Sequence, residues 1–287
     1  MSTFLLVSDL DGTLLTSART VSERTAGIIN RFIAAGGRFS VATARMAYGC
    51  DRLLADLDLN LPGVVMNGAA LYDFASGSYL EVRSIPGGAV ERAAAAIEDA
   101  GAGAFVYGVR DGRLTLGYTR EEDLAWTQYN SARAQEALPA FTRLGYENWD
   151  RLGEIIYLAV VGDVPSMTAT LAALGGVAGL SAHPYRNIYT GLDCLEYSSP
   201  EAGKEAAVLR LKDLVGADRL AVFGDNTNDL GMMRLADVSL APSTSVPEAL
   251  DAADEVIASN DEDGVGRALE AHWDTWLPRH PTSSGRI

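Results

Sequence analysis

The stretch SDLDGTLL, residues 8–15, follows directly on an apolar run from Phe4 to Val7. In an extended chain, side chains two positions apart point to the same side, so Asp9 and Asp11 are expected to converge while Leu10 faces away. Two carboxylates that are held close together repel each other and usually need a cation, a shared proton or open water. The remaining sequence must indicate which of these is present.

Composition and charge limit the classes of function. The chain has 287 residues, enough for one or two domains, and its hydrophobic content of 48% suits a globular fold with a sizeable core. A formal net charge of −15 argues against nucleic acid and against an anionic membrane surface as partners. An anionic substrate can still bind through a metal ion and a few local cations.

Three features favour a cytoplasmic protein. The two cysteines, Cys50 and Cys194, lie far apart and lack metal-ligand spacing, as is common in a reducing compartment. The N-terminal apolar run meets acidic residues too soon for a secretory signal. No stretch approaches the roughly 20 apolar residues that a membrane span requires, so no membrane partner is expected.

Strands and helices alternate in the first and last thirds of the chain. In the first third, the pattern predicts strands over 4–7, 39–42 and 64–66 and helices over 22–35 and 47–57. In the last third, it predicts helices over 203–215, 228–235, 246–252 and 264–272 and strands over 220–223, 237–240 and near Val256. This alternation predicts an α/β fold with a doubly wound, Rossmann-like parallel sheet that helices cover on both faces.

The middle of the chain shows a different pattern. It predicts helices over 88–100, 166–174 and about 120–134, and strands over 104–109, 113–118, 154–161, 179–183 and 186–190. This pattern predicts an α+β domain over residues 82–194, inserted between the two parts of the α/β domain, 1–81 and 195–287.

Polar or acidic residues follow four of the predicted strands. They are Asp9 and Asp11 after the first strand, Thr43-Ala44-Arg45 after the second, Asn67-Gly68 after the third, and Asp225 after LAVFG. In an open parallel sheet, ligands bind outside the carboxyl ends of the strands. We therefore expect these residues at one edge of the sheet.

The acidic residues at this edge indicate a metal site. Asp225 and Asp229 are four apart, so they lie about one turn from each other if a helix begins near Thr227. Together with Asp9 and Asp11 they form a set of oxygen ligands, which suits Mg²⁺. Zinc is disfavoured because the three histidines lack ligand spacing.

The same edge carries groups that suit a phosphate. Lys204 is expected in the first turn of a helix, where its ammonium and the free backbone N–H groups favour an anion, and Thr43 offers a hydroxyl. Phosphoryl transfer depends on such positioning and charge stabilisation. With Mg²⁺ present, one aspartate can attack phosphorus while the other carries a proton for the leaving oxygen.

These residues resemble the four motifs of the haloacid dehalogenase superfamily of phosphohydrolases. DLDGTLL resembles the first motif, Thr43 the second, Lys204 the third and GDNTND, residues 224–229, the fourth. The inserted segment resembles the mixed α/β cap, class IIB, of the Cof-type branch. Asn67-Gly68-Ala69 matches the NGA that typically follows the third strand there.

The resemblance implies a role for each matching residue. Asp9 would be the nucleophile that forms an aspartyl-phosphate, and Asp11 would protonate the leaving alcohol and then activate water. Mg²⁺ would be bound by Asp9, the backbone carbonyl of Asp11, and Asp225, with Asp229 orienting a metal-bound water. The residues that would hold phosphate oxygens are Thr43, Lys204 and Asn228.

One residue departs from the pattern of the branch, which commonly reads Thr-Gly-Arg where this chain has Thr43-Ala44-Arg45. The methyl group of Ala44 could crowd a backbone amide near the substrate, and Arg45 is a candidate substrate contact. In the inserted segment, Tyr107 together with Arg186, Asn187 and Asp193 could face the substrate, although each also fits an ordinary surface or fold role. The cap is expected to move over the site about hinges near residues 82 and 194.

The resulting hypothesis is a cytoplasmic, Mg²⁺-dependent phosphatase of small phosphate monoesters, such as sugar phosphates or a phosphorylated cofactor. A phosphomutase is the alternative, because the same site could support one if cations of the cap held a second phosphate. A non-enzymatic signalling module marked by aspartyl phosphorylation is less consistent with an inserted domain and the late GDNTND motif. The expected partner is a small phosphorylated metabolite, and the sequence leaves the oligomeric state open.

Overall fold

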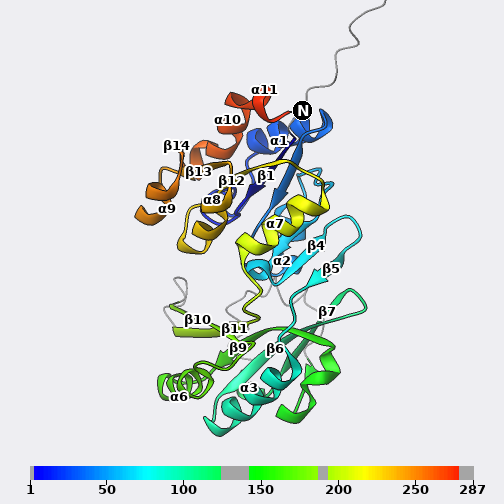
Figure 1. Cartoon of the computed structure of the whole chain (residues 1–287), viewed down its shortest axis with the longest axis vertical. Helices are drawn as coiled ribbons and strands as arrows, with labels where there is room; N and C mark the ends of the chain where they lie inside the picture. The colour runs from blue at the N-terminus through cyan, green and yellow to red at the C-terminus, as the bar shows by residue number, and fades with distance from the viewer. Residues whose placement is uncertain (1–2, 124–141, 187–192, 278–287) are drawn as a thin grey trace, which may run out of the picture. The chain divides into compact units, whose positions relative to one another are not determined.

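The computed structural model describes residues 3–123, 142–186 and 193–277 (Figure 1). The chain forms two compact units, Met1–Ser76 with Gly203–Ile287, and Gly77–Ala202. The expected boundaries, 82 and 194, therefore fall inside the second unit. The strands at its two ends, β5 (Ser78–Val82) and β11 (Asp193–Ser198), were largely assigned to the other domain. Within the described ranges, no helix is long and apolar enough to cross a membrane.

The first unit is built on a parallel sheet of five strands in the order β14-β13-β12-β1-β2. The strands are β1 (Phe4–Ser8), β2 (Arg38–Val41), β12 (Arg219–Phe223), β13 (Val238–Pro242) and β14 (Glu255–Ile257). β1 pairs with β12, so residues from the first and last thirds of the chain are neighbours in the sheet (Figure 1). This topology confirms the predicted α/β class.

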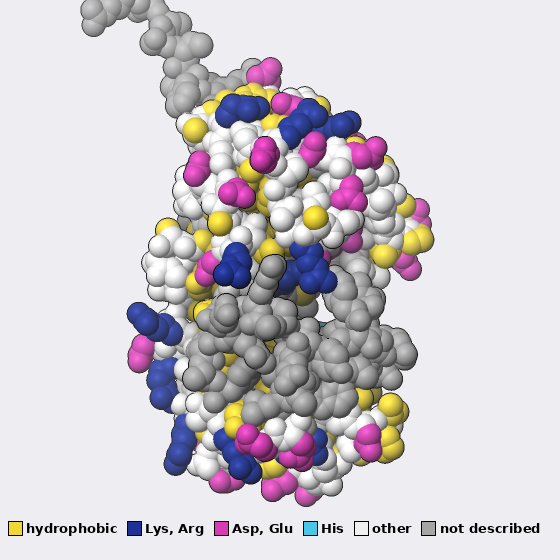
Figure 2. Space-filling model, turned by 180° about the vertical axis from the view of Figure 1, so that it is seen from behind, with side chains coloured by type: hydrophobic (Ala, Val, Ile, Leu, Met, Phe, Trp, Pro, Cys, Tyr) yellow, Lys and Arg dark blue, Asp and Glu magenta, His cyan; other side chains and the backbone are white. Residues whose placement is uncertain are grey.

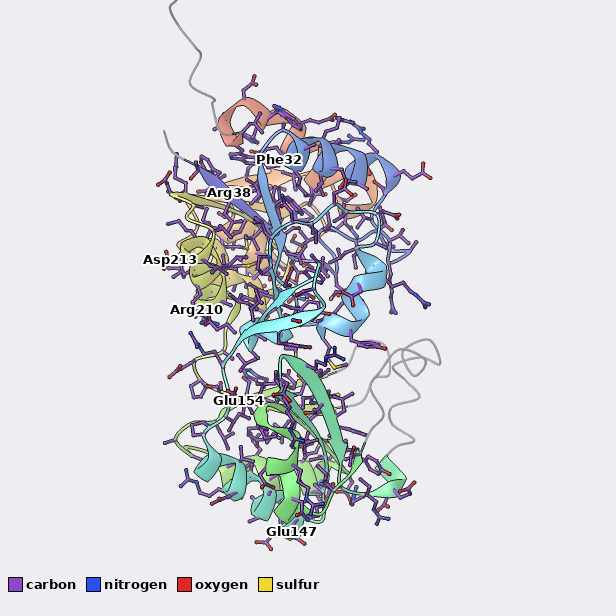
Figure 3. All side chains as sticks on the ribbon, turned by 90° about the vertical axis from the view of Figure 1, so that its right-hand side faces the viewer. Phe32, Arg38, Glu147, Glu154, Arg210 and Asp213 are labelled. Atoms are coloured by element: carbon purple, nitrogen blue, oxygen red, sulfur yellow. The ribbon has the colours of Figure 1, made fainter. Side chains whose placement is uncertain are left out.

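Helices cover both faces of this sheet, as the alternation of its buried residues requires. Phe4 and Leu6 of β1 pack in one apolar cluster with Phe32, a residue of α1 that Figure 3 labels. Leu5 and Val7 pack in a second cluster on the other face. The first cluster takes residues from α1 (Glu23–Ala34), α2 (Ala47–Leu53), α10 (Gly264–Ala271) and α11 (Trp273–Trp276). The second takes residues from α7 (Lys204–Leu214), α8 (Leu230–Leu235) and α9 (Pro247–Ala252).

The second unit contains a sheet of six strands in the order β10-β11-β9-β6-β7-β8. Its remaining strands are β6 (Gly103–Arg110), β7 (Arg113–Tyr118), β8 (Thr142–Arg143), β9 (Glu154–Val161) and β10 (Ser181–Arg186). All neighbours are antiparallel except β7 and β8. A separate apolar cluster joins one face of the sheet to α3 (Gly87–Asp99), α6 (Val164–Leu174) and the 3₁₀ segment η4 (Tyr146–Leu152).

Two details of the second unit differ from the sequence-based expectation. The strand expected near 179–183 is β10, over Ser181–Arg186, whereas only Arg186 of the strand expected near 186–190 lies within the described residues. β11, over Asp193–Ser198, is a strand that the sequence did not predict. β11 mixes polar and apolar residues, and its pairing with both β9 and β10 defines it as a strand. Of the helix expected over 120–134, only the 3₁₀ turn η2 (Glu121–Asp123) is described. Asn187 also lies outside the described residues.

A tight turn in the first unit sets where α7 begins. The turn η1 (Met66–Gly68) follows β3 (Gly63–Val65) and leads into β4 (Ala70–Asp73), a strand that the sequence did not predict. Gly68 has φ +90°, and a Cβ there would lie 2.2 Å from the carbonyl oxygen of Gly203. The carbonyl of Gly68 accepts a hydrogen bond from Arg210 on α7, labelled in Figure 3, at 3.2 Å. The turn and the start of α7 are therefore in direct backbone contact.

We expect Gly68→Ala to destabilise the protein by about 3 kcal/mol or more, because the left-handed conformation and the backbone clash both oppose a side chain. Gly36→Ala is the matched control: Gly36 has φ +91° but open space around its Cβ position. The control should lose only about 1–2 kcal/mol, the cost of the conformation. Urea denaturation measures both free energies of unfolding, and equal losses would contradict the close packing of Gly68 on Gly203.

Candidate active site

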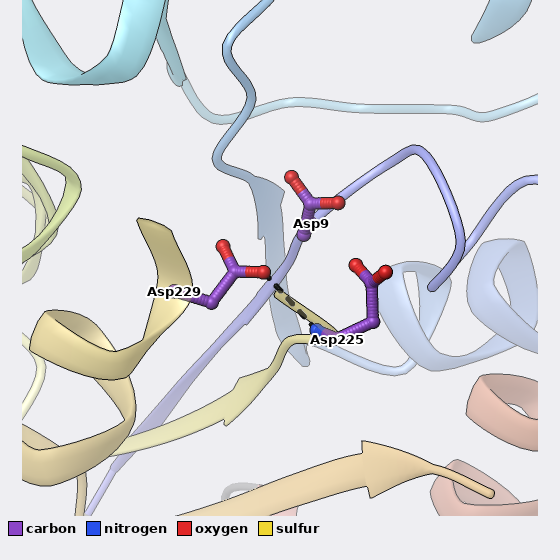
Figure 4. Close-up of side chains that lie close together, drawn as sticks. All are labelled: Asp9, Asp225 and Asp229. Atoms are coloured by element: carbon purple, nitrogen blue, oxygen red, sulfur yellow. Dashed lines mark hydrogen bonds between the residues drawn. The ribbon is translucent and has the colours of Figure 1, made fainter. Parts of the chain in front are cut away.

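Three aspartates converge at the carboxyl edge of the parallel sheet. Asp9 follows β1, Asp225 follows β12, and Asp229 ends the 3₁₀ turn η5 (Thr227–Asp229). One carboxylate oxygen from each lies within 4.8 Å of the others, and Figure 4 shows the three side chains close together. The sheet creates this convergence because Ser8 pairs with Phe223, and the N–H of Asp9 donates to the carbonyl of Phe223 at 2.9 Å.

A buried lysine ties two of these carboxylates together. Lys204, the first residue of α7, is 2% exposed. Its Nζ donates to Oδ1 of Asp9 at 2.5 Å and to Oδ1 of Asp229 at 2.7 Å. The lysine that the sequence placed at a helix start thus lies against the proposed nucleophile.

Asp229 also organises the loop that carries Asp225. Its second oxygen, Oδ2, accepts the backbone N–H groups of Asp225 and Asn226, each at 3.1 Å. Figure 4 shows the first of these bonds. The side chain of Asp229 is fully buried, so both of its oxygens serve the protein itself. This arrangement fits a residue that orients Lys204 and the loop of Asp225, and it does not suit direct contact with a substrate.

Two residues of the first motif, Gly12 and Thr13, lie against the carboxylate of Asp225. The hydroxyl of Thr13, a buried residue, donates to Oδ1 of Asp225 at 2.9 Å. Gly12 has φ +82°, and a Cβ there would lie 2.4 Å from Oδ2 of Asp225. Both residues lie within DLDGTLL, but the sequence alone indicates no role for either. Their function becomes visible only when residue 225 is brought beside them.

Asp11 takes a different partner from Asp9. Its two carboxylate oxygens accept hydrogen bonds from Nε and Nη2 of Arg45, each at 2.5 Å. The sequence suggested that Asp9 and Asp11 converge, but the group of carboxylates that lie close together contains Asp9, Asp225 and Asp229 without Asp11. β1 ends at Ser8, so the alternation of a strand does not extend to Asp11.

The second motif is arranged around Thr43, which is buried after β2. Its hydroxyl oxygen accepts the backbone N–H of Arg45 at 3.0 Å. This bond fixes the turn from which Arg45 reaches Asp11. Ala44 is exposed, so its methyl group is not packed into the interior. The structure thus assigns Arg45 an ion pair with Asp11, and a contact with substrate remains a prediction.

Asn228 lies at the exposed surface of η5. Its Nδ2 donates to Oδ1 of Asn67 at 3.1 Å. The two asparagines belong to loops 161 residues apart in sequence. The sequence predicted Asn67 at this edge, and the structure shows that its partner there is Asn228.

Comparison with known proteins agrees with this architecture. A family model described as haloacid dehalogenase-like hydrolase matches residues 6–269. The chain belongs to the haloacid dehalogenase-like hydrolases. The resemblance drawn from the four motifs is thereby confirmed.

Several curated relatives of the chain are named phosphatases. The chain is 26% identical to a 5-amino-6-(5-phospho-D-ribitylamino)uracil phosphatase of Bacillus subtilis, covering 91% of this chain and 95% of the relative. It is 23% identical to a pyridoxal phosphate phosphatase of Escherichia coli, with coverage of 95% and 99%. Among solved structures, a sugar phosphatase of subclass IIB matches with a TM-score of 0.69 at 19% identity, covering 94% of this chain and 99% of that one. This last likeness concerns the fold.

Burial and neighbouring charges shift the pKa values of the ionisable groups in this haloacid dehalogenase-like site. Burial raises the pKa of Asp9 well above its usual value, and the carboxylates of Asp229 and Asp225 add to the effect while Lys204 opposes it. Burial also raises the pKa of Asp225 to about 6, with a further contribution from Asp229. Burial alone would lower the pKa of Lys204, but Asp9 and Asp229 raise it above its usual value.

The acidic cluster fits a divalent metal ion. When all groups are ionised, the three carboxylates and Lys204 leave two negative charges, which one divalent cation neutralises. The ligand atoms are carboxylate oxygens, the chemistry that Mg²⁺ prefers. Asp9 and Asp225 are the better candidates to hold the ion, since both oxygens of Asp229 already accept hydrogen bonds from the protein.

We expect Asp225→Asn to stabilise the metal-free protein above pH 6. The pKa of Asp225 is about 6 in the folded state and about 3.9 when unfolded, so ionisation opposes folding as the pH rises through this range. Removing the charge should raise the free energy of unfolding on the order of 2 kcal/mol at pH 8. Thermal denaturation in EDTA at pH 4.5 and pH 8 measures this, and the gain should be clearly larger at pH 8, where the effect of the charge is complete.

Asp73→Asn is the matched control for this substitution. A hydrogen bond from the Ser76 hydroxyl lowers the pKa of Asp73, so its ionised form favours the folded state at neutral pH. The control should be slightly less stable than the original protein at pH 8. A loss of stability in both variants would contradict the repulsion assigned to Asp225.

Proposed function

We propose that this protein is a Mg²⁺-dependent phosphatase that hydrolyses small phosphate monoesters in the cytoplasm through an aspartyl-phosphate on Asp9. The observation that carries the proposal is the carboxylate of Asp9, held by Lys204 at the sheet edge beside Asp225 and Asp229. A nucleophile needs such fixed geometry together with neighbouring positive charge that offsets the phosphate. The names of the relatives support small phosphorylated metabolites as substrates.

The proposed reaction has two steps. In the first, an oxygen of Asp9 bonds to phosphorus, the ester P–O bond breaks, and Asp11 donates a proton to the leaving oxygen. In the second, Asp11 takes a proton from a water that attacks the same phosphorus. The bond between phosphorus and Asp9 then breaks, which releases inorganic phosphate and restores both carboxyl groups.

The other residues would bind the phosphoryl oxygens. Thr43, Lys204 and Asn228 supply a hydroxyl, an ammonium and an amide at the same edge of the sheet. Asp9, Asp225 and the backbone carbonyl of Asp11 would hold Mg²⁺, which would neutralise the charge that builds up on the phosphoryl group. Arg45 is paired with Asp11, and an anionic substrate that competes for the guanidinium would free Asp11 to carry the proton.

A surface of mixed charge is consistent with a small-molecule substrate. Figure 2 shows acidic and basic side chains scattered over the described face, on a chain whose formal net charge is −15. A phosphomutase would use the same aspartyl-phosphate but would need a second phosphate site. Product analysis with a bisphosphate primer distinguishes phosphate release from phosphate transfer between positions of one substrate.

We expect Asp9→Asn to lower kcat by at least about 10³-fold, because an amide cannot form the phosphoryl bond. The variant should remain folded, since the amide oxygen can still accept the hydrogen bond from Lys204. Phosphate release from a panel of monoesters gives kcat/KM for each, and circular dichroism reports folding. Near-normal turnover by this variant would exclude Asp9 as the nucleophile, whereas a stoichiometric, persistent phosphate on the original protein would indicate a signalling module.

EDTA should abolish turnover, and added Mg²⁺ should restore it. Thr13→Val offers a graded form of this test, because it removes the hydroxyl that holds Asp225. Loss of such an outer contact typically weakens metal binding by roughly 10–100-fold. We expect the Mg²⁺ concentration for half-maximal activity to rise by that factor, with kcat at saturating Mg²⁺ much less affected. Full activity in EDTA would contradict the metal requirement.

A further inference from the structure

Three consecutive residues at the sheet edge have left-handed backbone conformations. Met66 and Asn67 each have φ +51°, and Gly68 has φ +90°. Glycine adopts this conformation readily, but it is unfavourable for methionine and only tolerated by asparagine. Such outliers persist where the surroundings enforce them, and they are concentrated at functional sites. Reversing the chain direction does not by itself require three such residues, so the unfavourable backbone of η1 indicates a further role.

Backbone hydrogen bonds tie this turn to the second motif. The N–H of Met66 donates to the carbonyl of Arg45 at 2.9 Å, and the N–H of Asn67 donates to the carbonyl of Thr43 at 3.0 Å. The side chain of Met66 is buried. The turn is thus fixed relative to Thr43 and Arg45, both residues of the proposed site, and it packs on Gly203 next to Lys204.

The conformation presents the amide of Asn67 to the fourth motif. Its Oδ1 accepts the hydrogen bond from Nδ2 of Asn228 at 3.1 Å. Asn228 is exposed and, within the part of the chain that the structure describes, its side chain has no other hydrogen-bond partner. One hydrogen bond to Nδ2 restricts the rotation of a planar amide and leaves its second N–H for another acceptor.

We propose that Asn67 is a positioning residue that holds the amide of Asn228 so that its second N–H can donate to a phosphate oxygen. This inference rests on the proposed function, in which Asn228 binds phosphate. Asn67 acts through Asn228 and forms no bond to the reacting atoms. The left-handed backbone of Asn67 places this side chain against Asn228.

A purely structural role for Asn67 makes the opposite prediction for one substitution. If asparagine is present only because it tolerates a left-handed backbone, glycine should replace it without loss, because glycine adopts φ +51° more readily. If the side chain positions Asn228, Asn67→Gly should weaken phosphate binding while the fold is kept or stabilised. This substitution therefore separates the two explanations.

The experiment compares Asn67→Gly, Asn228→Ala and the double variant. Binding of inorganic phosphate is measured by calorimetry in the presence of Mg²⁺, and kcat and KM are measured with the best monoester. We expect Asn67→Gly to raise the phosphate Kd and the KM by roughly fivefold to tenfold, as for loss of one hydrogen bond, with little change in kcat. Its thermal midpoint should be unchanged or higher. The double variant should bind phosphate no more weakly than Asn228→Ala alone.

Asp111→Gly is the matched control. Asp111 also has a left-handed backbone, φ +53°, in the hairpin between β6 and β7. This variant should keep the original Kd and KM. A raised Kd in the control would show that glycine acts through general flexibility and would overturn the inference.

Two further outcomes would also overturn it. Unchanged phosphate binding in Asn67→Gly, with weakened binding in Asn228→Ala, would refute the role of Asn67 and leave the proposed function intact. Multiplied losses in the double variant would show that Asn67 acts independently of Asn228. Unchanged binding in Asn228→Ala would instead remove Asn228 from the phosphate site and refute that part of the proposed function. Because calorimetry measures the Kd of inorganic phosphate directly, these outcomes can be distinguished even if no monoester is hydrolysed.

Discussion

A buried ammonium between two buried carboxylates constrains the whole catalytic unit. The side chains of Lys204, Asp9 and Asp229 are 1%, 9% and 0% exposed. Isolated charges at such positions would be very unfavourable, so each requires its partner. The start of α7, the end of β1 and the turn η5 must therefore meet at one point. The negative charge left over at this point favours a cation there.

The residues around this centre are held by one another more than by solvent. Thr13 fixes Asp225, Asn67 fixes Asn228, and Arg45 fixes Asp11, each through a side-chain hydrogen bond between different loops. The loops of Thr13, Arg45 and Asn228 follow strands of the parallel sheet. The loop of Asn67 follows β3, which a parallel bridge between Val64 and Ala42 joins to the chain just after β2. Such mutual support lowers the reorganisation that a charged transition state would otherwise require. The side chains of the site are therefore held in place by the fold of the first unit.

The second unit has an independent basis for its stability. Its antiparallel sheet, α3 and α6 share an apolar cluster separate from the two clusters of the parallel sheet. The first unit is assembled from two chain segments that pair along β1 and β12. An insertion between them is compatible with folding because each unit buries its own apolar surface. The chemistry proposed for Asp9 requires only residues of the first unit.

Local sequence patterns were sufficient for the elements whose burial follows a simple period. The strand expected over 154–161 and the helix expected over 203–215 correspond closely to β9 and α7. β11 could not be predicted in this way, because its mixed residues become a strand through pairing with β9 and β10. The motifs likewise indicated Asp9 and Asp225, which follow strand ends, and Lys204, which begins a helix.

The sequence by itself determined the α/β class, the presence of an inserted domain and the identity of the residues at the sheet edge. Only the tertiary structure decided which of these residues touch, as in the pairs Asp11–Arg45 and Thr13–Asp225. It also decided that Met66 and Asn67 adopt left-handed conformations. The physical reason is range: periodicity and turn preferences act over a few neighbours, whereas these contacts join loops that only the assembled sheet brings together.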